Sequence, residues 1–253
     1  ENPRAFQGKG VTTWEGLIKS VRAKVKGTKV KIRLGASSGE WKAMVADEAA
    51  RTTFAKNIKT VLEKNKLDGI DLDFEWAENE KEYKDYSLAI LKMREVLGDK
   101  YLFSVSLHPV CYKISKEAIE AVDFISLQCY GPSPVRFPIE KYCSDIQMVL
   151  EYGIPKEKLV AGVPFYGVTK DNSKKTEAYF NFVQNGLVTS PAQNEVIYQG
   201  DTYVFDGQDN IRIKTRYAKE QKLKGMMSWD LATDLPLSDS RSLLKTMTEE
   251  LRE

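Results

Sequence analysis

Short β-rich runs alternate with amphipathic segments along most of the chain. Six runs have the composition of strands, at 29–36, 68–75, 101–107, 122–130, 159–165 and 225–231. Apolar residues recur at helical spacing between them, over 54–62, 86–97, 115–121 and 138–152. Strands that alternate with helices in this way predict parallel β-α-β units.

A longer segment, at about 167–210, interrupts this alternation before the last predicted strand. It predicts a helix over 177–184 and a hairpin that pairs 196–198 with 203–205 and turns at Gly200-Asp201. The chain has no GxGxxG or Walker A motif, which a nucleotide-binding doubly wound sheet normally carries. We therefore expect a TIM (β/α)8 barrel, formed by one domain over 1–253 with a small insertion at about 167–210.

Charge and composition narrow the possible function. Lys and Arg number 38 and Asp and Glu 36, so the formal net charge is +2 and gives no electrostatic reason to expect nucleic acid as a partner. No apolar run is long enough to predict a membrane span. Three Cys and one His argue against a disulfide framework, a His-rich metal site and a serine triad, so carboxylates are the expected reactive groups.

Carboxylates are concentrated in the second predicted strand. Alternate residues of a strand share a face, so Asp71, Asp73 and Glu75 point to one side and the apolar residues between them to the other. Stacked carboxylates can share protons, so that the outermost acts as a general acid. They can also bind Mg²⁺ or Ca²⁺, or form the solvated face of an edge strand. Metal binding is less favoured, because no other strand end supplies further ligands.

The run at 68–76, DGIDLDFEW, resembles the DxxDxDxE signature of family 18 glycoside hydrolases, which include chitinases and endo-β-N-acetylglucosaminidases. Two further segments are similar to the family's seventh and eighth strands, LVAGVPFYG at 159–167 and GMMSWD at 225–230. The resemblance implies that the six predicted strands are strands 3–8 of the barrel. Only 28 residues precede the first of them, so strands 1 and 2 are expected to be missing from this sequence.

The resemblance also implies a role for each residue of the signature. Glu75 would protonate the glycosidic oxygen, Asp73 would hydrogen-bond the substrate's acetamido nitrogen, and Asp71 would share a proton with Asp73. The residues expected to bind substrate are Tyr130, Gln128, Trp229 and Tyr166. No cofactor and no metal are expected.

These roles predict a retaining glycoside hydrolase that cleaves β-1,4 bonds of N-acetylglucosamine-containing glycans, chitin or chito-oligosaccharides, by substrate-assisted catalysis. One alternative is an endo-β-N-acetylglucosaminidase acting on the chitobiose core of N-glycans. The other is a chitinase-like protein that binds sugar without cleaving it; such proteins characteristically lose the acid at the position of Glu75, which is present here. The expected partner is an oligo- or polysaccharide, with no nucleic acid and no membrane span. By resemblance the protein would be a monomer located outside the cell or in the periplasm.

Several residues depart from the family pattern or have open roles. Arg33 lies where the family has SxGG, and we expect it either to pair with Asp71 or Asp73 or to face a helix. Gly131 replaces an acidic or amide residue after Tyr130. His108 is either a hydrogen-bonded structural residue or a substrate contact. The remaining expectations are outer sugar subsites at Trp41 and Trp76, and buried thiols at Cys129 and Cys143.

Overall fold

The computed structural model describes residues 13–37, 40–171 and 173–253 of the chain. These residues divide into two compact units. The first runs to Val105 and includes Ile114–Asp123, and the second comprises Ser106–Lys113 and Phe124–Glu253.

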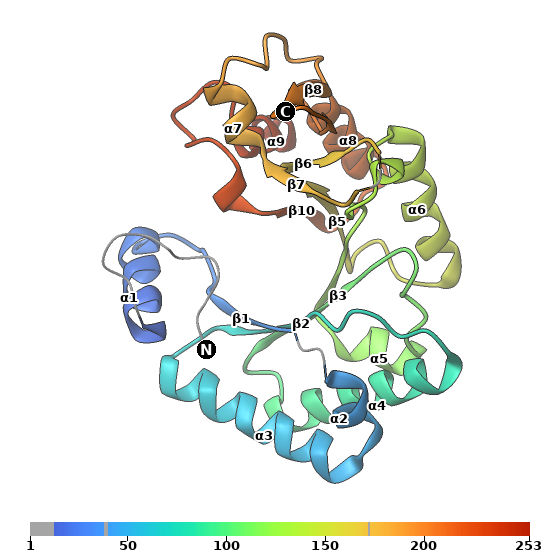
Figure 1. Cartoon of the computed structure of the whole chain (residues 1–253). Coiled ribbons are helices and arrows are strands. Elements are labelled where there is room, and N and C mark those ends of the chain that lie inside the picture. Colours follow the sequence, from blue (N-terminus) through green and yellow to red (C-terminus); the bar gives the residue numbers. More distant parts are fainter. Residues whose placement is uncertain (1–12, 38–39, 172) are drawn as a thin grey trace. The chain divides into compact units, whose positions relative to one another are not determined.

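The helices and strands of the first unit follow the predicted alternation, with two further helices, at 14–25 and 41–46, that the sequence did not predict (Figure 1). In chain order they are α1 (Trp14–Val25), β1 (Arg33–Ala36), α2 (Trp41–Ala46), α3 (Glu48–Asn65), β2 (Gly69–Leu72), α4 (Glu80–Leu97), β3 (Leu102–Leu107, which ends in the second unit) and α5 (Lys116–Ala121).

The second unit begins with the same alternation and then adds short strands before its last helices. Its elements are β4 (Phe124–Leu127), the 3-10 helix η1 (Pro134–Arg136), α6 (Ile139–Tyr152), β5 (Leu159–Pro164), β6 (Tyr166–Thr169), β7 (Thr176–Ala178), α7 (Tyr179–Gln184), β8 (Glu195–Tyr198), β9 (Asp201–Val204), α8 (Gln208–Glu220), β10 (Gly225–Trp229), η2 (Leu231–Thr233) and α9 (Leu243–Arg252).

Six strands form one sheet in the order β1-β2-β3-β4-β5-β10. The register is parallel between β1 and β2, β2 and β3, β4 and β5, and β5 and β10. Each strand thus neighbours the one before it in the alternating pattern, as expected for consecutive β-α-β units. The predicted α/β class and the six parallel strands are confirmed, although most strands are shorter than the β-rich runs that predicted them.

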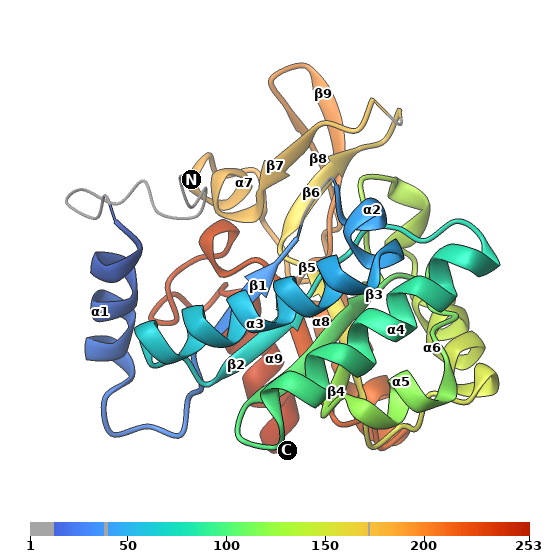
Figure 2. The same cartoon turned by 90° about the horizontal axis from the view of Figure 1, so that it is seen from below.

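In the first unit, helices α2, α3 and α4 lie on one side of β1 and β2 (Figures 1 and 2). An aromatic cluster fills the space between them: Trp41 of α2 stacks on Phe74 with ring centroids 5.3 Å apart, and Tyr86 of α4 is 5.3 Å from the same Phe74 ring. The Tyr86 hydroxyl also donates to the carbonyl of Leu72, at 3.3 Å. This packing buries the apolar face of the acidic segment.

Helix α4 shows how local sequence sets an element's ends. The side chain of Asn79 accepts a hydrogen bond from the Glu82 amide at 3.0 Å and caps the first turn. The helix stops at Gly98, whose φ of 60° lies in a region that favours glycine. The C-terminal end agrees with the helix predicted over 86–97, whereas the helix begins six residues earlier, at Glu80.

The second unit contains an antiparallel sheet in the order β7-β6-β9-β8, within the segment that interrupts the alternation. The β8–β9 hairpin was predicted, but its turn is displaced by one residue. Asp201 pairs with Tyr198, so the turn consists of Gln199 and Gly200 rather than Gly200 and Asp201. Both turn residues have positive φ, 52° and 88°, as a two-residue hairpin turn requires.

Helix α6 runs from the predicted start after Pro138 to the predicted stop at Gly153, but its buried face differs from the expectation. The periodicity placed Ile139, Cys143, Ile146 and Leu150 on that face, whereas the buried residues are Tyr142, Asp145, Ile146 and Val149. Asp145 is accommodated because Arg136 and Lys141 both pair with its carboxylate. Among the residues that the structure describes, no helix combines the length and apolar character needed to cross a membrane.

Candidate active site

The acidic segment projects its carboxylates away from the apolar face that α2 and α4 cover. Ile70, Leu72 and Phe74 are at most 2% exposed. Asp71 and Asp73 are half-buried and Glu75 is exposed. The hydrogen-bonded strand β2 ends at Leu72, so Asp73 and Glu75 lie just beyond its carboxyl end. In parallel sheets this is the edge at which reactive side chains are usually displayed.

Asp71 is held by two neighbouring strands. The register of β1, β2 and β3 places Gly35 and Ser104 on either side of it. The Ser104 hydroxyl donates to Oδ1 of Asp71, and Arg33 Nη1 lies 3.8 Å from the same oxygen. The sequence left open whether Arg33 pairs with Asp71, pairs with Asp73 or faces a helix. In the structure its guanidinium lies beside Asp71. Ser104 was not among the expected site residues, although it lies in the third predicted strand beside the signature.

Glu75 is positioned through its backbone. The indole nitrogen of Trp41 donates to the Glu75 carbonyl at 3.0 Å, and Trp41 itself is only 1% exposed. The expectation that Trp41 forms an outer sugar subsite is therefore wrong: its ring packs in the aromatic cluster and its polar edge fixes the chain at Glu75. The carboxylate of Glu75 stays exposed. The peptide bond that follows Glu75 is cis, as is the one after Trp229 in the second unit.

In the second unit, two of the expected substrate-binding residues contact each other. Tyr130 and Tyr166 have ring centroids 6.3 Å apart, edge to face. Tyr130 is 6% exposed and its hydroxyl donates to Sδ of Met227 at 3.6 Å. Gly162 makes room for this ring, because a Cβ there would lie 2.9 Å from Tyr130 Cε1.

The other two expected substrate-binding residues differ in exposure. Gln128 is 7% exposed, and its backbone amide donates to the carbonyl of Leu107 at 2.7 Å. Trp229 is the last residue of β10, pairs in register with Pro164 and is 54% exposed. An indole so exposed at a strand end can stack on the apolar face of a ligand, whereas Gln128 is almost entirely buried.

His108 makes structural contacts within the second unit. Its Nδ1 accepts from the amide of Val110 at 3.2 Å, so Nε2 carries the proton and donates to the Tyr130 carbonyl at 3.0 Å. Burial, together with the positive charge of Arg136, lowers the pKa of His108 to about 4. The imidazole is thus neutral near pH 7 and holds the backbone of Tyr130. A Cβ at Gly131 would lie 3.6 Å from Nε2, so this glycine is not sterically required.

The three cysteines form no disulfide. All three thiols are free, with Cys111 and Cys129 buried and Cys143 partly exposed, so the expectation of a buried thiol is confirmed for Cys129 and wrong for Cys143. Burial raises the pKa of the Cys129 thiol, so it is protonated and unreactive near neutral pH. In the part of the chain with described coordinates, no three His, Cys, Asp or Glu side chains are grouped so as to hold a metal ion.

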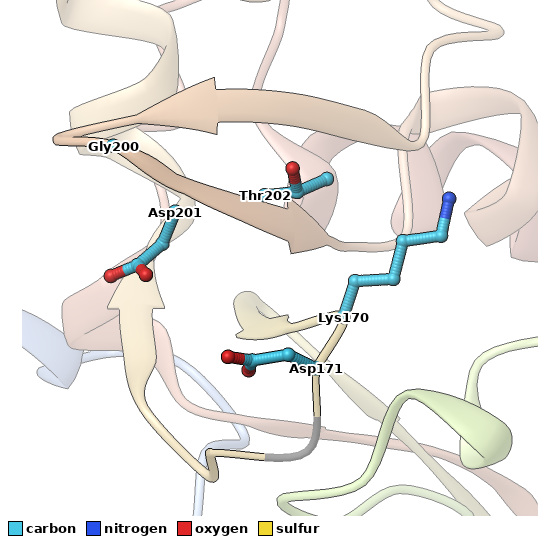
Figure 3. A pocket seen from close by; sticks show the side chains of 5 residues that line it. All are labelled: Lys170, Asp171, Gly200, Asp201 and Thr202. Carbon is cyan, nitrogen blue, oxygen red and sulfur yellow. The ribbon is translucent and has the colours of Figure 1, made fainter.

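A separate surface hollow of about 380 Å³ lies in the antiparallel sheet of the second unit (Figure 3). Lys170, Asp171, Gly200, Asp201 and Thr202 line it. Its charged groups already have partners: Lys170 pairs with Glu195 at 2.6 Å, Lys175 pairs with Asp201 at 2.7 Å, and Asp171 accepts from the Ser173 amide at 2.9 Å. The hollow therefore presents no group that needs a ligand.

Comparison with known proteins decides the family. The model of glycosyl hydrolases family 18 matches residues 9–234, which is most of the chain and includes the acidic segment, Tyr130 and Trp229. The chain belongs to glycosyl hydrolase family 18.

Relatives of this family 18 chain are distant in sequence. A probable chitinase 2 from Drosophila melanogaster is 23% identical over 81% of the chain, and the chain spans 56% of that protein's length. The structure of a chitinase from Bacteroides thetaiotaomicron superposes with a TM-score of 0.81 at 22% identity, covering 92% of this chain and 80% of that one. A chitinase-like agglutinin from Robinia pseudoacacia gives 0.78 at 19% identity, covering 93% and 84%. Proteins named as chitinases and one named as an agglutinin thus share this fold, so the fold alone does not fix the activity.

Proposed function

We propose that this family 18 protein is a retaining glycoside hydrolase that cleaves β-1,4 bonds between N-acetylglucosamine units of chitin or chito-oligosaccharides. The observation that carries the proposal is the arrangement of the acidic segment. Glu75 is exposed at the carboxyl end of β2, while Asp71 and Asp73 lie behind it on the same face and are half-buried.

In the proposed first step, Glu75 donates its proton to the glycosidic oxygen and the leaving sugar departs. The acetamido oxygen of the remaining sugar attacks the anomeric carbon, which gives an oxazolinium ion. Asp73 accepts a hydrogen bond from the acetamido nitrogen and stabilises the positive charge that develops there. Asp71 supports Asp73 from the buried side of the strand.

In the second step, Glu75, now ionised, removes a proton from a water molecule that attacks the anomeric carbon. The ring of the oxazolinium ion opens, Glu75 recovers its proton, and the product keeps the original anomeric configuration. Water enters on the face that the leaving group vacated, because the acetamido oxygen covers the other face during the intermediate.

Sugar-binding roles are proposed for the second unit. Tyr130 now donates to Met227 Sδ, which is a weak acceptor, so an amide oxygen of a ligand would be a better partner. Trp229 offers an exposed ring for stacking. Tyr166 supports Tyr130 by its edge-to-face contact, and Gln128 supplies an amide. Residues 1–253 would form one catalytic domain with an insertion at about 167–210. The protein would work as a monomer outside the cell or in the periplasm.

The decisive experiment replaces Glu75 by Gln and compares it with Glu63→Gln, an exposed carboxylate on α3. Turnover of fluorogenic chito-oligosaccharides should fall at least about a thousandfold in Glu75→Gln, because no proton is available for the leaving oxygen. Oligosaccharide affinity, measured by calorimetry, should stay within about tenfold, because the amide keeps the shape of the side chain. Glu63→Gln should behave as the wild type. Full activity of Glu75→Gln would rule out the acid role.

A substrate panel separates this proposal from its alternatives. Release of sugar from a high-mannose glycopeptide would move the assignment to an endo-β-N-acetylglucosaminidase. Binding of chito-oligosaccharides with no turnover of either substrate would favour a sugar-binding protein, the class to which the structurally similar agglutinin belongs by name.

A further inference from the structure

A guanidinium stands beside the innermost carboxylate of the acidic segment. Arg33 Nη1 is 3.8 Å from Asp71 Oδ1, and the two side chains are 25% and 18% exposed. The same Nη1 donates to the Ser104 hydroxyl, and that hydroxyl donates to Asp71 Oδ1. Ser104 is completely buried. Arg33 therefore reaches Asp71 in two ways, directly and through one bridging hydroxyl.

The strand register explains why the arginine can reach this far. Arg33 pairs with Gly69 and Gly35 with Asp71, so Arg33 and Asp71 are diagonal neighbours on one face of β1 and β2. No side chain stands between them, because their direct cross-strand partners, Gly69 and Gly35, have none. A Cβ at Gly69 would lie 1.9 Å from the Leu102 carbonyl oxygen, so that position cannot hold a larger residue. The guanidinium extends across the open face to the carboxylate.

The charged groups around this contact are few. On β2 and its extension, Asp73 and Glu75 follow Asp71 on the same face, and Asp68 at the other end accepts from the Ile32 amide at 2.8 Å. Lys31 of the segment before β1 pairs with Asp68 at 3.7 Å. The carboxylate of Asp123 also acts on Arg33, but it pairs with Arg94 at 2.9 Å. Among these described groups, Arg33 is the cation that lies against Asp71.

We propose that Arg33 is a positioning residue for the hydrolysis: it balances the charge of Asp71 and fixes that carboxylate, so that Asp73 carries its own negative charge toward the substrate without sharing a proton with Asp71. This inference rests on the proposed function. It also gives a role to the position at which the chain departs from the SxGG pattern.

Two opposing effects act on the charge of Arg33. Burial lowers the pKa of Arg33, and the nearby carboxylates of Asp71 and Asp123 act in the opposite direction. A guanidinium stays protonated at every pH at which the protein would work, so the positive charge is permanent. Two adjacent carboxylates without a cation bind one proton between them, whereas a cation beside one of them makes uptake of that proton less favourable.

The test uses Arg33→Gln, which keeps a donor for Ser104 but removes the charge, and Arg33→Lys, which keeps the charge. The first measurement needs no turnover: ¹³C NMR of labelled aspartate follows proton uptake by the acidic segment as the pH falls. In Arg33→Gln the midpoint of that uptake should rise by about 1 pH unit or more. Arg33→Lys should restore at least half of the difference, because the point charge remains on a shorter donor.

The second measurement is the pH profile of kcat/KM on a fluorogenic chito-oligosaccharide. The acid limb should move upward in Arg33→Gln by the same amount as the NMR midpoint, with a larger loss in kcat than change in KM, since the contact of Asp73 strengthens as charge develops. Thermal unfolding of each variant checks that the fold is kept. Should Arg33→Gln fail to fold, Arg33→Lys and Ser104→Ala provide the comparison, with the midpoint expected to rise in Ser104→Ala by less than about 1 unit.

The outcomes separate the two proposals. An unchanged NMR midpoint in the folded variants would overturn the role of Arg33, and so would a shifted midpoint with an unmoved acid limb, while the hydrolase proposal would stand. If the wild type turns over no substrate of the panel, the proposed function fails, and the positioning role for hydrolysis fails with it. The NMR midpoint would then still report whether Arg33 controls proton uptake.

Discussion

At the scale of single residues, His108 shows how burial turns a reactive group into a structural one. Both ring nitrogens are used inside the second unit, with Val110 donating to Nδ1 and Nε2 donating to the Tyr130 carbonyl. Protonation would place a positive charge near Arg136 and would cost Nδ1 its role as acceptor. Burial is the main cause of the lowered pKa of His108, about 4 against 6.5 for a free imidazole, and the positive charge of Arg136 adds to it.

The lowered pKa of His108 predicts a window of pH-dependent stability. Between pH 6.5 and about 4 the unfolded chain binds a proton at His108 that the folded protein does not, so the free energy of unfolding falls as the pH falls through this window. The total effect is at most about 3 kcal/mol, and it is absent above the window. Urea unfolding at a series of pH values should show this loss in the wild type.

The comparison variant is His108→Gln, whose side-chain amide can donate to the Tyr130 carbonyl but does not titrate. Its free energy of unfolding should depend less on pH between 6.5 and 4 than that of the wild type. Carboxylates titrate in both proteins, so only the difference between the two curves reports on His108. Parallel curves would show that the histidine is not the group responsible.

The sequence predicted the positions of residues along a strand where these depend only on the alternation of side chains between the two faces. The two-residue repeat of a strand was enough to predict that Asp71 and Asp73 lie on the face opposite to their apolar neighbours, and the observed burial agrees with this prediction. Trp41 was misjudged because its burial depends on a stack with Phe74, which comes from a different element. The partner of Arg33 could not be chosen from sequence, since it depends on the register of β1 on β2.

At the scale of elements, helix α8 carries a buried ion pair that the sequence did not indicate. Lys214 Nζ lies 2.5 Å from Asp206 Oδ2, and the two side chains are 1% and 0% exposed. Asn210 donates to the other oxygen of Asp206 at 3.2 Å. The ammonium also lies 5.4 Å from the ring of Tyr142 on α6, so the pair anchors α8 to α6.

Removing one member of this pair should destabilise the protein strongly. Lys214→Met leaves Asp206 buried without its cation, and we expect a loss of about 3–5 kcal/mol in the free energy of unfolding. The double variant Lys214→Met with Asp206→Asn should lose less than the single variant, because no uncompensated charge remains. Chemical denaturation of the single and double variants measures both quantities.

The exposed pair of Lys175 and Asp201 is a matched control. Their atoms approach to 2.7 Å, but the side chains are 56% and 30% exposed, so Lys175→Met should destabilise the protein much less than Lys214→Met. Equal losses for Lys175→Met and Lys214→Met would mean that burial does not set the strength of these contacts.

Element order was easier to predict than element boundaries. The alternation of strands and helices predicted all six parallel strands, because each crossover helix forces the next strand to lie parallel to the last. The hairpin turn was displaced because Gly200-Asp201 and Gln199-Gly200 both contain a glycine, and cross-strand pairing of Tyr198 with Asp201 decides between them. The buried face of α6 was displaced because Asp145, a charged residue, takes a core position.

At the scale of the whole molecule, charge bears on which glycan the protein acts upon. The chain has 38 basic and 36 acidic residues, so its net charge is small. An N-acetylated chito-oligosaccharide carries no formal charge, and long-range electrostatic attraction therefore contributes little to its encounter with the protein. Added salt screens only charge–charge interactions, so the salt dependence of the rate tests whether the substrate is neutral or charged.

We expect kcat/KM for an N-acetylated chito-oligosaccharide to change by less than about twofold between about 50 and about 300 mM NaCl, because screening has no substrate charge to act on. A partly deacetylated oligosaccharide, which is cationic, and a peptidoglycan fragment with carboxylates serve as charged comparisons. Their rates should vary more with salt. The rate on the partly deacetylated oligosaccharide should also be lower, since the proposed chemistry needs an acetamido group next to the cleaved bond. A higher and strongly salt-dependent rate on either charged glycan would contradict the proposed substrate. It would point instead to recognition by the ionic side chains of the protein, for which the small net charge provides no long-range support.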